Sequence, residues 1–168
     1  MEKINYPIYL IGMPGSGKSE IAAQLAKTLH IEHIDLDDEI EKHSHMYIHE
    51  IFERYGEATF RQKETDALLE VSQRKAVIAC GGGIILNESH KKTMNQGTVI
   101  YLMVDVDVIE KRIRHSQHRP LLKKTSLKQL FEERRFKYLD FANVTIPNDG
   151  EIDETIESIL NFIKRRNS

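Results

Sequence analysis

A short glycine-rich run, Gly12–Ser19, constrains this chain more than any other feature of its sequence. It reads G-M-P-G-S-G-K-S and fits the pattern G-x-x-x-x-G-K-[ST]. A continuous apolar run at residues 8–11 precedes it and is typical of a buried strand. After it, apolar residues recur at helical spacing, at Ile21, Ala22, Leu25, Ala26 and Leu29. Strand, loop and helix in this order predict a loop that binds the phosphates of a nucleotide.

The chemistry of such a loop assigns a role to each of its residue types. Glycines allow the tight turn that brings backbone N–H groups up to phosphate oxygens, and the following helix adds the positive end of its dipole. Lys18 is expected to place its charge on the β- and γ-phosphates. The hydroxyl of Ser19 is expected to bind Mg²⁺, so the loop predicts a nucleotide that is bound together with this ion.

The length and charge of the chain limit the remaining possibilities. At 168 residues it is expected to form a single domain, residues 1–168. With 24 Lys and Arg against 26 Asp and Glu, the net charge of -2 provides no overall basic field for a nucleic-acid backbone. We therefore expect no nucleic-acid partner, and any bound anion must be met by local groups.

The apolar segments and the cysteine content predict a protein of the cytoplasm. The longest apolar stretch, around residues 99–104, is too short to cross a bilayer, so no membrane partner is expected. The first five residues lack the apolar core of a secretory signal. Cys80 is the only cysteine, which excludes an internal disulfide, and its apolar neighbours favour a small buried side chain.

Beyond the phosphate loop, segments typical of strands alternate with segments typical of helices. Strands are predicted at residues 31–35, 76–80, 98–104 and 144–146, and helices at 48–55, 60–71, about 107–115, 126–138 and 152–164. Apolar strands separated by helices predict an α/β fold with a parallel sheet covered on both sides. Ligands of such sheets bind at the carboxyl ends of the strands, so polar residues after strands are candidates for a site.

Two carboxylates follow the second predicted strand. Asp35 and Asp37 are two residues apart, and strand alternation predicts that both point to the same side of the chain. One can hold Mg²⁺ or its waters, and Asp37 can orient or deprotonate an acceptor hydroxyl. The alternative is that Asp37 or Asp38 caps the helix that begins there, with Glu41 three residues after Asp38. We assign Asp38 to capping, and Asp35 and Asp37 to the site.

Two arginines lie where a ligand anion would explain them. Arg61 comes near the start of a helix, where the local dipole gives its charge no favourable partner. It is expected either to bind a ligand carboxylate or to pair with Glu57 or Glu64, and spacing alone does not decide between them. Arg119 lies in a polar stretch, residues 115–125, that is suited to a lid over a transferring phosphoryl group. Taken alone, that stretch favours a solvated loop arginine over a lid.

Two further patterns receive structural interpretations. His45 and His49 stand four apart on a predicted helix, but without a third fixed ligand we do not assign a zinc site to them. Asp107, with Glu110 three residues later, predicts the N-terminal cap of a helix.

Taken together, these segments resemble the shikimate kinase family, in order and over nearly the whole chain. The matching segments are the phosphate loop, D-L-D at residues 35–37, G-E-A-T-F-R at 56–61, the glycine triplet at 81–83 and R-P-L-L at 119–122. In a partial match, Arg134, Tyr138 and Ala142 keep the spacing of the family, while Phe136 stands where proline is usual. Residues 148–152, where family members often contact adenine, match poorly.

The resemblance implies a set of ligand-binding residues. Shikimate would be bound by Asp37, Arg61, Gly82 and Arg134, with the arginines on its carboxylate and Asp37 on its ring hydroxyls. ATP would contact Gly15, Ser16, Gly17, Lys18, Ser19, Glu20, Arg112 and Arg119. Mg²⁺ would be held by Ser19 and Asp35, and the catalytic residues would be Lys18, Asp37 and Arg119. Because Phe136 replaces the usual proline, either Arg134 or Arg135 faces the ligand.

The resemblance also implies a fold and a reaction. The family has the P-loop NTPase fold of the nucleoside monophosphate kinase type, a five-stranded parallel sheet in the order 2-3-1-4-5 flanked by helices. A substrate-binding helical segment at about 38–72 and a lid at about 115–125 would complete it. The implied reaction transfers the γ-phosphoryl group of ATP to the 3-hydroxyl of shikimate, a step toward chorismate and the aromatic amino acids. ATP and shikimate would be the partners of a monomer.

Two other functions share part of this pattern. Another small-metabolite kinase of the same fold, such as a gluconate kinase, would share the phosphate loop, but Arg61, the glycine triplet and Arg134 argue against it. A nucleotide-dependent switch would need a guanine-reading N-K-x-D and a D-x-x-G after a strand, and neither occurs in the sequence.

Overall fold

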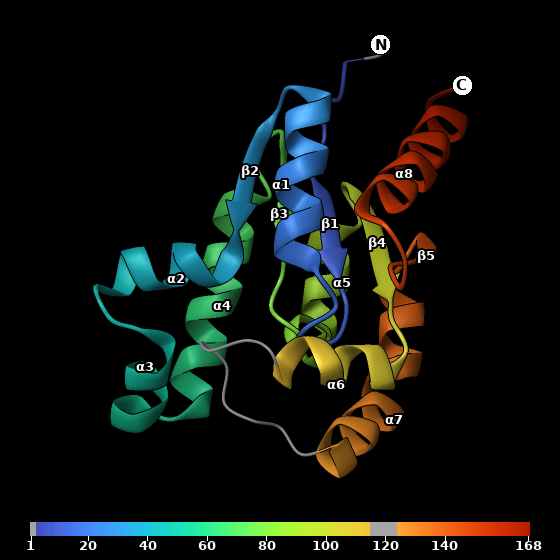
Figure 1. Cartoon of the computed structure of the whole chain (residues 1–168). Helices are drawn as coiled ribbons and strands as arrows, with labels where there is room; N and C mark the ends of the chain where they lie inside the picture. The colour runs from blue at the N-terminus through green and yellow to red at the C-terminus, as the bar shows by residue number, and fades with distance from the viewer. Residues whose placement is uncertain (1–2, 115–123) are drawn as a thin grey trace.

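The computed structural model describes residues 3–114 and 124–168, except for the side chains of Lys124 and Thr125. Strands and helices alternate along the chain (Figure 1). The strands are β1 (Ile8–Ile11), β2 (Glu32–Asp35), β3 (Ala76–Ala79), β4 (Thr98–Met103) and β5 (Val144–Pro147). The helices are α1 (Lys18–Leu29), α2 (Leu36–Ser44), α3 (Ile48–Tyr55), α4 (Glu57–Val71), the 3₁₀ turn η1 (Ile84–Leu86), α5 (Glu88–Met94), α6 (Val106–Arg114), α7 (Lys124–Phe141) and α8 (Ile152–Asn167).

The five strands form one parallel sheet in the order β2-β3-β1-β4-β5, which confirms the predicted order. β1 lies at the centre, where Leu10 pairs with Ala79 of β3 and with Ile100 of β4. Because the strands are parallel, their carboxyl ends meet at one edge of the sheet. The phosphate loop therefore leaves the middle of the sheet at the edge where ligands bind.

Alternate residues of the central strand pack on opposite faces of the sheet. Ile8 and Leu10 belong to a buried cluster with residues of α1 and α8, whereas Tyr9 and Ile11 belong to a second cluster with residues of α4 and α7. Figure 1 shows α1 and α8 in front of the sheet and α4 and α5 behind it. The prediction of a sheet covered by helices on both faces is confirmed.

The predicted cap of α6 is wrong by two residues. Asp105 directly precedes Val106, the first residue of the helix. Its side chain accepts a hydrogen bond of 2.9 Å from the backbone N–H of Asp107. Asp107 itself lies in the first turn, where its negative charge is favourable next to the helix N-terminus. The sequence pattern located the start of the helix but assigned the cap to the wrong aspartate.

Some helices extend beyond their sequence predictions. α7 runs over Lys124–Phe141 rather than 126–138, and the short α5 was not predicted at all. Asn87 caps α5 by accepting from the N–H of Ser89 at 2.9 Å. In this part of the chain, a local side-chain contact rather than an apolar stripe defines where the helix begins.

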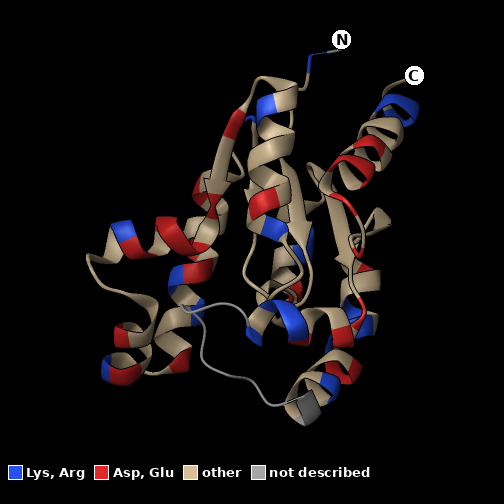
Figure 2. Cartoon of the chain, viewed as in Figure 1, with Lys and Arg blue, Asp and Glu red and all other residues tan. Residues whose placement is uncertain are grey.

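Charges of both signs are interspersed along the helices (Figure 2). Within the described ranges, none of the helices has the length and apolar character needed to span a membrane. Arg119 and most of the predicted lid at 115–125 lie outside the described residues.

Candidate active site

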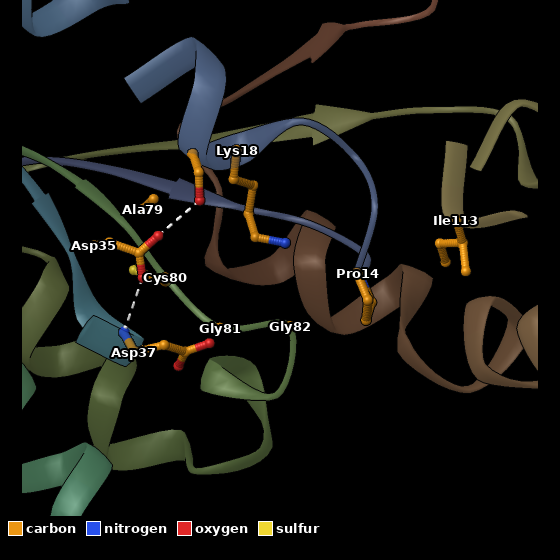
Figure 3. Close-up of a pocket in the computed structure, with 10 residues that line it drawn as sticks. Pro14, Lys18, Asp35, Asp37, Ala79, Cys80, Gly81, Gly82 and Ile113 are labelled. Atoms are coloured by element: carbon orange, nitrogen blue, oxygen red, sulfur yellow. Dashed lines mark hydrogen bonds between the residues drawn. The ribbon is translucent and has the colours of Figure 1, made fainter. Parts of the chain in front are cut away.

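A cavity of about 370 Å³ opens at the carboxyl ends of β1, β2 and β3 (Figure 3). It is lined by Pro14, Lys18, Ser19, Asp35, Asp37, Ala79, Cys80, Gly81, Gly82 and Ile113. The fold therefore brings together residues from the phosphate loop, the D-L-D run and the glycine triplet, which are far apart in the sequence. Glu20, an expected ATP contact, lies exposed in the first turn of α1 and does not line this cavity.

The phosphate loop holds its lysine over its own backbone. The Nζ of Lys18 donates to the carbonyl oxygens of Gly12 and Met13 at 2.8 and 2.9 Å. Gly15 and Gly17 have φ angles of 81° and 92°, a left-handed conformation that side chains disfavour. A Cβ on Gly17 would also lie 2.7 Å from Nδ2 of Asn148, so both backbone conformation and space require glycine at this position.

A polar network braces the loop from behind. The carbonyl of Ser16 accepts hydrogen bonds from Nδ2 of Asn148 at 2.7 Å and from Nη1 of Arg112 at 3.2 Å. Arg112 also donates to the carbonyl of Asn148 at 2.7 Å, and the hydroxyl of Thr155 donates to the Oδ1 of Asn148 at 2.7 Å. The structure thus places Arg112, predicted as an ATP contact, against the backbone of the phosphate loop.

The two expected metal ligands touch each other. The hydroxyl of Ser19 donates to Oδ2 of Asp35 at 2.7 Å, and both side chains line the cavity. Figure 3 draws this bond as one of the two dashed lines that end on Asp35. The other oxygen of Asp35 accepts from the backbone N–H of Asp37 at 3.1 Å. A hydroxyl and a carboxylate are hard oxygen donors of the kind that Mg²⁺ prefers.

The geometry around Asp35 corrects two details of the sequence analysis. Asp35, not Asp38, is the N-terminal cap of α2. Strand alternation does not relate Asp35 to Asp37, because the helix already begins at Leu36. Both carboxylates still line the cavity, since the first turn of α2 carries Asp37 back over the end of the strand.

Among the carboxylates of the described residues, Asp37 has the most strongly shifted pKa. Its pKa rises from 3.8 to about 6, chiefly because the side chain is buried and further because Asp35 and Glu64 are negatively charged. The positive charge of Lys18 opposes this rise. A carboxyl group whose pKa lies near neutrality can accept a proton from a hydroxyl during a reaction.

Arg61 makes both of the ion pairs that its spacing predicted. Its Nη1 donates to the Oε1 of Glu64 at 3.0 Å, while its Nε lies 3.5 Å from the Oε1 of Glu57. Within the described part of the chain, that Nε is a buried donor without a hydrogen-bond acceptor. The guanidinium lies against the glycine triplet, since a Cβ on Gly83 would come 2.6 Å from its Nη1.

Glu64 is an unusual side chain to find beside this site, because it is only 1% exposed. Burial raises its pKa, and the charges of Arg61 and Arg134 lower it. The negative charge of Glu64 in turn raises the pKa of Asp37. Glu64 therefore connects the electrostatics of the two arginines with that of Asp37.

The choice between Arg134 and Arg135 is decided by the orientation of α7. Nη1 of Arg134 lies 3.3 Å from where a Cβ on Gly82 would be, at the glycine triplet. The guanidinium of Arg135 instead lies over the ring of Phe136, 4.8 Å from its centroid, and 3.7 Å from Glu132. Arg134 is thus the arginine that faces the site.

The two histidines noted in the sequence do not share a helix. His45 ends α2 in a left-handed conformation with φ of 51°, and His49 lies in α3. The helical spacing on which a shared metal ligand set would depend is therefore absent.

Three residues near the site were missed or undervalued in the sequence. Glu64 occupies the apolar stripe of α4, and a charged residue at a core-facing position was the signal that could have found it. Tyr138 donates from its hydroxyl to the carbonyl of Gly82 at 2.7 Å, which fixes the glycine triplet against α7. Asn148 is isolated in the sequence, and no local pattern connects it with Ser16.

Comparisons with known proteins agree with this geometry. Residues 14–164 match the family model described as shikimate kinase. A shikimate kinase of Sulfurihydrogenibium sp. is 39% identical over 95% of this chain and 98% of its own, and one of Aquifex aeolicus is 37% identical over 91% and 93%.

Solved structures lead to the same family. A shikimate kinase from Acinetobacter baumannii in complex with shikimate superimposes with a TM-score of 0.90 at 34% identity, covering 98% of this chain and 96% of that one. A gluconokinase from Sinorhizobium meliloti, at 14% identity and a TM-score of 0.62, shares the fold alone. The family model and these relatives, over most of the chain, show that it belongs to the shikimate kinase family.

Proposed function

We propose that the chain transfers the γ-phosphoryl group of ATP to the 3-hydroxyl group of shikimate in the cavity of Figure 3. The observation that carries this proposal is the set of side chains around the glycine triplet. Lys18 and Asp37 line the cavity itself, and Arg61 and Arg134 lie against Gly83 and Gly82. An acceptor with one carboxylate and several hydroxyls suits two guanidinium groups opposite a carboxylate.

On the nucleotide side, the backbone of Gly15–Ser19 binds the phosphates of ATP. Lys18 releases its bonds to the loop carbonyls and turns to the β- and γ-phosphates, where its charge offsets the charge of the transferring group. Arg112 and Asn148 hold the loop in the conformation that presents its N–H groups. In this role Arg112 serves ATP binding through the loop.

On the acceptor side, Arg61 and Arg134 bind the carboxylate of shikimate together with the backbone at Gly82. Asp37 accepts a hydrogen bond from the 3-hydroxyl and takes its proton as the bond between that oxygen and the γ-phosphorus forms. The bond from the γ-phosphorus to the bridging oxygen breaks, and ADP leaves with the electron pair. The raised pKa of Asp37 suits it to receive this proton.

Ser19 and Asp35 would hold Mg²⁺ with the nucleotide. Their oxygens lie 2.7 Å apart at the cavity edge, and a hydroxyl with a carboxylate fits the preference of this ion. When bound, Mg²⁺ neutralises charge on the phosphate oxygens. The bond between Ser19 and Asp35 keeps both side chains at that edge.

The remaining assignments rest on the family resemblance. The chain acts as a single domain, with the helical segment at about 38–72 shaping the acceptor site and Arg119 reaching the ATP phosphates from the lid. The chain works as a monomer in the cytoplasm and binds neither nucleic acid nor membrane. Size-exclusion chromatography with light scattering would test the oligomeric state.

An ADP-release assay with shikimate, gluconate and AMP as acceptors tests the proposal. We expect Mg²⁺-dependent release of ADP with shikimate alone, since gluconate and AMP do not combine a ring triol with a carboxylate. Turnover with gluconate instead would establish the alternative kinase, and release with none of the three would contradict the proposed reaction.

A further inference from the structure

A buried histidine joins two segments that flank the acceptor side of the site. His90 lies on α5 and is only 1% exposed. Its Nδ1 lies 2.8 Å from the carbonyl oxygen of Ile84 in η1, and its Nε2 lies 2.7 Å from the hydroxyl of Thr65 in α4. Both ring nitrogens are thus within hydrogen-bond distance of a partner on a different element.

The direction of each hydrogen bond follows from the partners. A carbonyl oxygen accepts only, so Nδ1 of His90 must carry the proton that it donates to Ile84. In the neutral ring Nε2 is then an acceptor, and the hydroxyl of Thr65, which also lies 3.1 Å from the carbonyl oxygen of Arg61, gives its single proton to Nε2 at the shorter distance of 2.7 Å. Burial and the charge of Arg61 lower the pKa of His90, so the neutral ring prevails at neutral pH.

The two partners of His90 are adjacent in sequence to residues of the acceptor site. Ile84 directly follows Gly83, against which the guanidinium of Arg61 lies. Thr65 follows Glu64, the ion-pair partner of Arg61, and stands one helical turn after Arg61 itself. The hydrogen-bonded path therefore runs from the glycine triplet, through the imidazole, to the helix that carries Arg61.

We propose that His90 is a positioning residue for the acceptor site. It holds the glycine triplet and α4 at the separation that lets Arg61 and Gly82 bind one carboxylate. The inference rests on the proposed function, because it names that carboxylate as the one of shikimate. His90 does not touch the substrate. It acts by fixing η1 against α4, and an error of about 1 Å between binding groups can be costly in affinity and rate.

Thr65 allows a sharper test than His90, because it can be changed without emptying a buried ring site. Thr65→Val keeps the shape of the side chain but removes the hydroxyl, and with it both the bond to His90 and the 3.1 Å contact with the carbonyl of Arg61 in the same helix, while Thr65→Ser keeps the hydroxyl. The loss of a bond within one helix is what the Thr93→Val control measures, and the double-mutant cycle isolates the part that acts through His90. We expect Thr65→Val to raise the KM for shikimate about 5- to 10-fold with little change in the KM for ATP. Thr65→Ser should stay near the wild-type KM values.

Thr93→Val provides a matched control on α5. The hydroxyl of Thr93 makes its bond of 3.4 Å to the carbonyl of Ser89 within its own helix. The same substitution there should leave both KM values unchanged. If Thr65→Val also leaves the KM for shikimate unchanged, or raises the KM for ATP equally, His90 has no positioning role.

A double-mutant cycle links the effect to His90. His90→Asn can keep the donor to Ile84 but is too short to reach Thr65. If both residues act through one bond, His90→Asn combined with Thr65→Val should raise the KM for shikimate no more than the larger single effect. If the increase in the KM for shikimate of the double variant equals the product of the two single increases, the residues act independently and the proposal is overturned. Wild-type turnover with shikimate, measured alongside, tests the proposed function separately.

Discussion

The nucleotide side of this site consists mostly of backbone groups, whereas the acceptor side consists mostly of charged side chains. On the nucleotide side, one continuous loop is held from behind by Arg112 and Asn148 through the carbonyl of Ser16. On the acceptor side, the charged side chains come from three separated helices and are contributed by Asp37 of α2, Arg61 of α4 and Arg134 of α7. A backbone cradle can be encoded locally, whereas a set of charged side chains depends on how the helices pack.

The difference also appears in the electrostatics. On the nucleotide side, Lys18 donates to two carbonyl oxygens of its own loop. On the acceptor side, burial and neighbouring carboxylates raise the pKa of Asp37, and burial raises that of Glu64. Ionising these two carboxyl groups therefore costs the folded protein free energy. Substitutions on the two sides should therefore affect turnover, acceptor affinity and stability in distinct ways.

The largest effect is expected for the charges that face the transferring phosphoryl group. Lys18→Ala and Arg119→Ala should each lower kcat at least ~100-fold, because each removes a positive charge from the developing transition state. Calorimetric titration with shikimate should show that acceptor affinity is retained. Near-normal turnover by either purified variant would remove that residue from the catalytic role.

Asp37→Asn should lower kcat about 100-fold, since it removes the group that takes the hydroxyl proton. The amide still accepts a hydrogen bond, so the affinity for shikimate should change much less. Steady-state kinetics together with direct binding would separate the two quantities. A loss of affinity in proportion to rate would mean that Asp37 orients the acceptor without acting as a base.

Arg134→Met should raise the KM for shikimate about 10-fold or more, because a charge-assisted hydrogen bond to the carboxylate is lost. Arg135→Met is the matched control on the same helix, since the guanidinium of Arg135 lies over Phe136. Kinetics with shikimate varied at saturating ATP measure both variants. Equal effects of the two substitutions would contradict the orientation of α7 in which Arg134 alone of the two faces the glycine triplet.

Asp37→Asn should also stabilise the protein without ligands at neutral pH. Because the pKa of Asp37 is raised in the folded state, ionising it costs stability as the pH rises from 3.8 to about 6. The free energy of unfolding of the variant should therefore exceed that of the wild type by about 1 to 2 kcal/mol at about pH 8, and the difference should vanish below about pH 4. Urea denaturation at both pH values measures this, and a difference independent of pH would contradict it.

The smallest effect is expected behind the phosphate loop. Asn148→Ala should raise the KM for ATP about 5-fold and leave the KM for shikimate unchanged, because it frees the carbonyl of Ser16 from one of its two side-chain donors. Thr155→Val, which removes only the support of Asn148, should act in the same direction and less strongly. An effect on shikimate alone would show that the two sides are not independent.

Local patterns were sufficient where neighbouring residues cooperate. The strand, loop and helix around Gly12–Ser19 were predicted, because apolar periodicity and glycine spacing act over short distances. The order of the strands in the sheet came from the family resemblance and not from these local patterns. Local reasoning failed at helix starts. Asp35 and Asp105 turned out to be the caps in place of Asp38 and Asp107, since the choice among nearby aspartates depends on one or two dihedral angles.

Contacts between distant segments were beyond local reasoning. The bond from Asn148 to Ser16 and the one from Tyr138 to Gly82 each join segments that meet only when the sheet and α7 have packed. The choice of Arg134 over Arg135 likewise depends on the rotation of α7, and adjacent residues of a helix point about 100° apart.

The sequence by itself determined the fold class, the phosphate loop and the family, because these depend on apolar spacing and on contiguous motifs whose backbone geometry is intrinsic. The tertiary structure alone decided the acceptor side: which arginine faces the glycine triplet, where Glu64 lies, and why Asp37 holds its proton more tightly than an ordinary aspartate. The physical reason is that burial and the distances between charges exist only after the helices have packed, and these two quantities set both pKa values and ligand geometry.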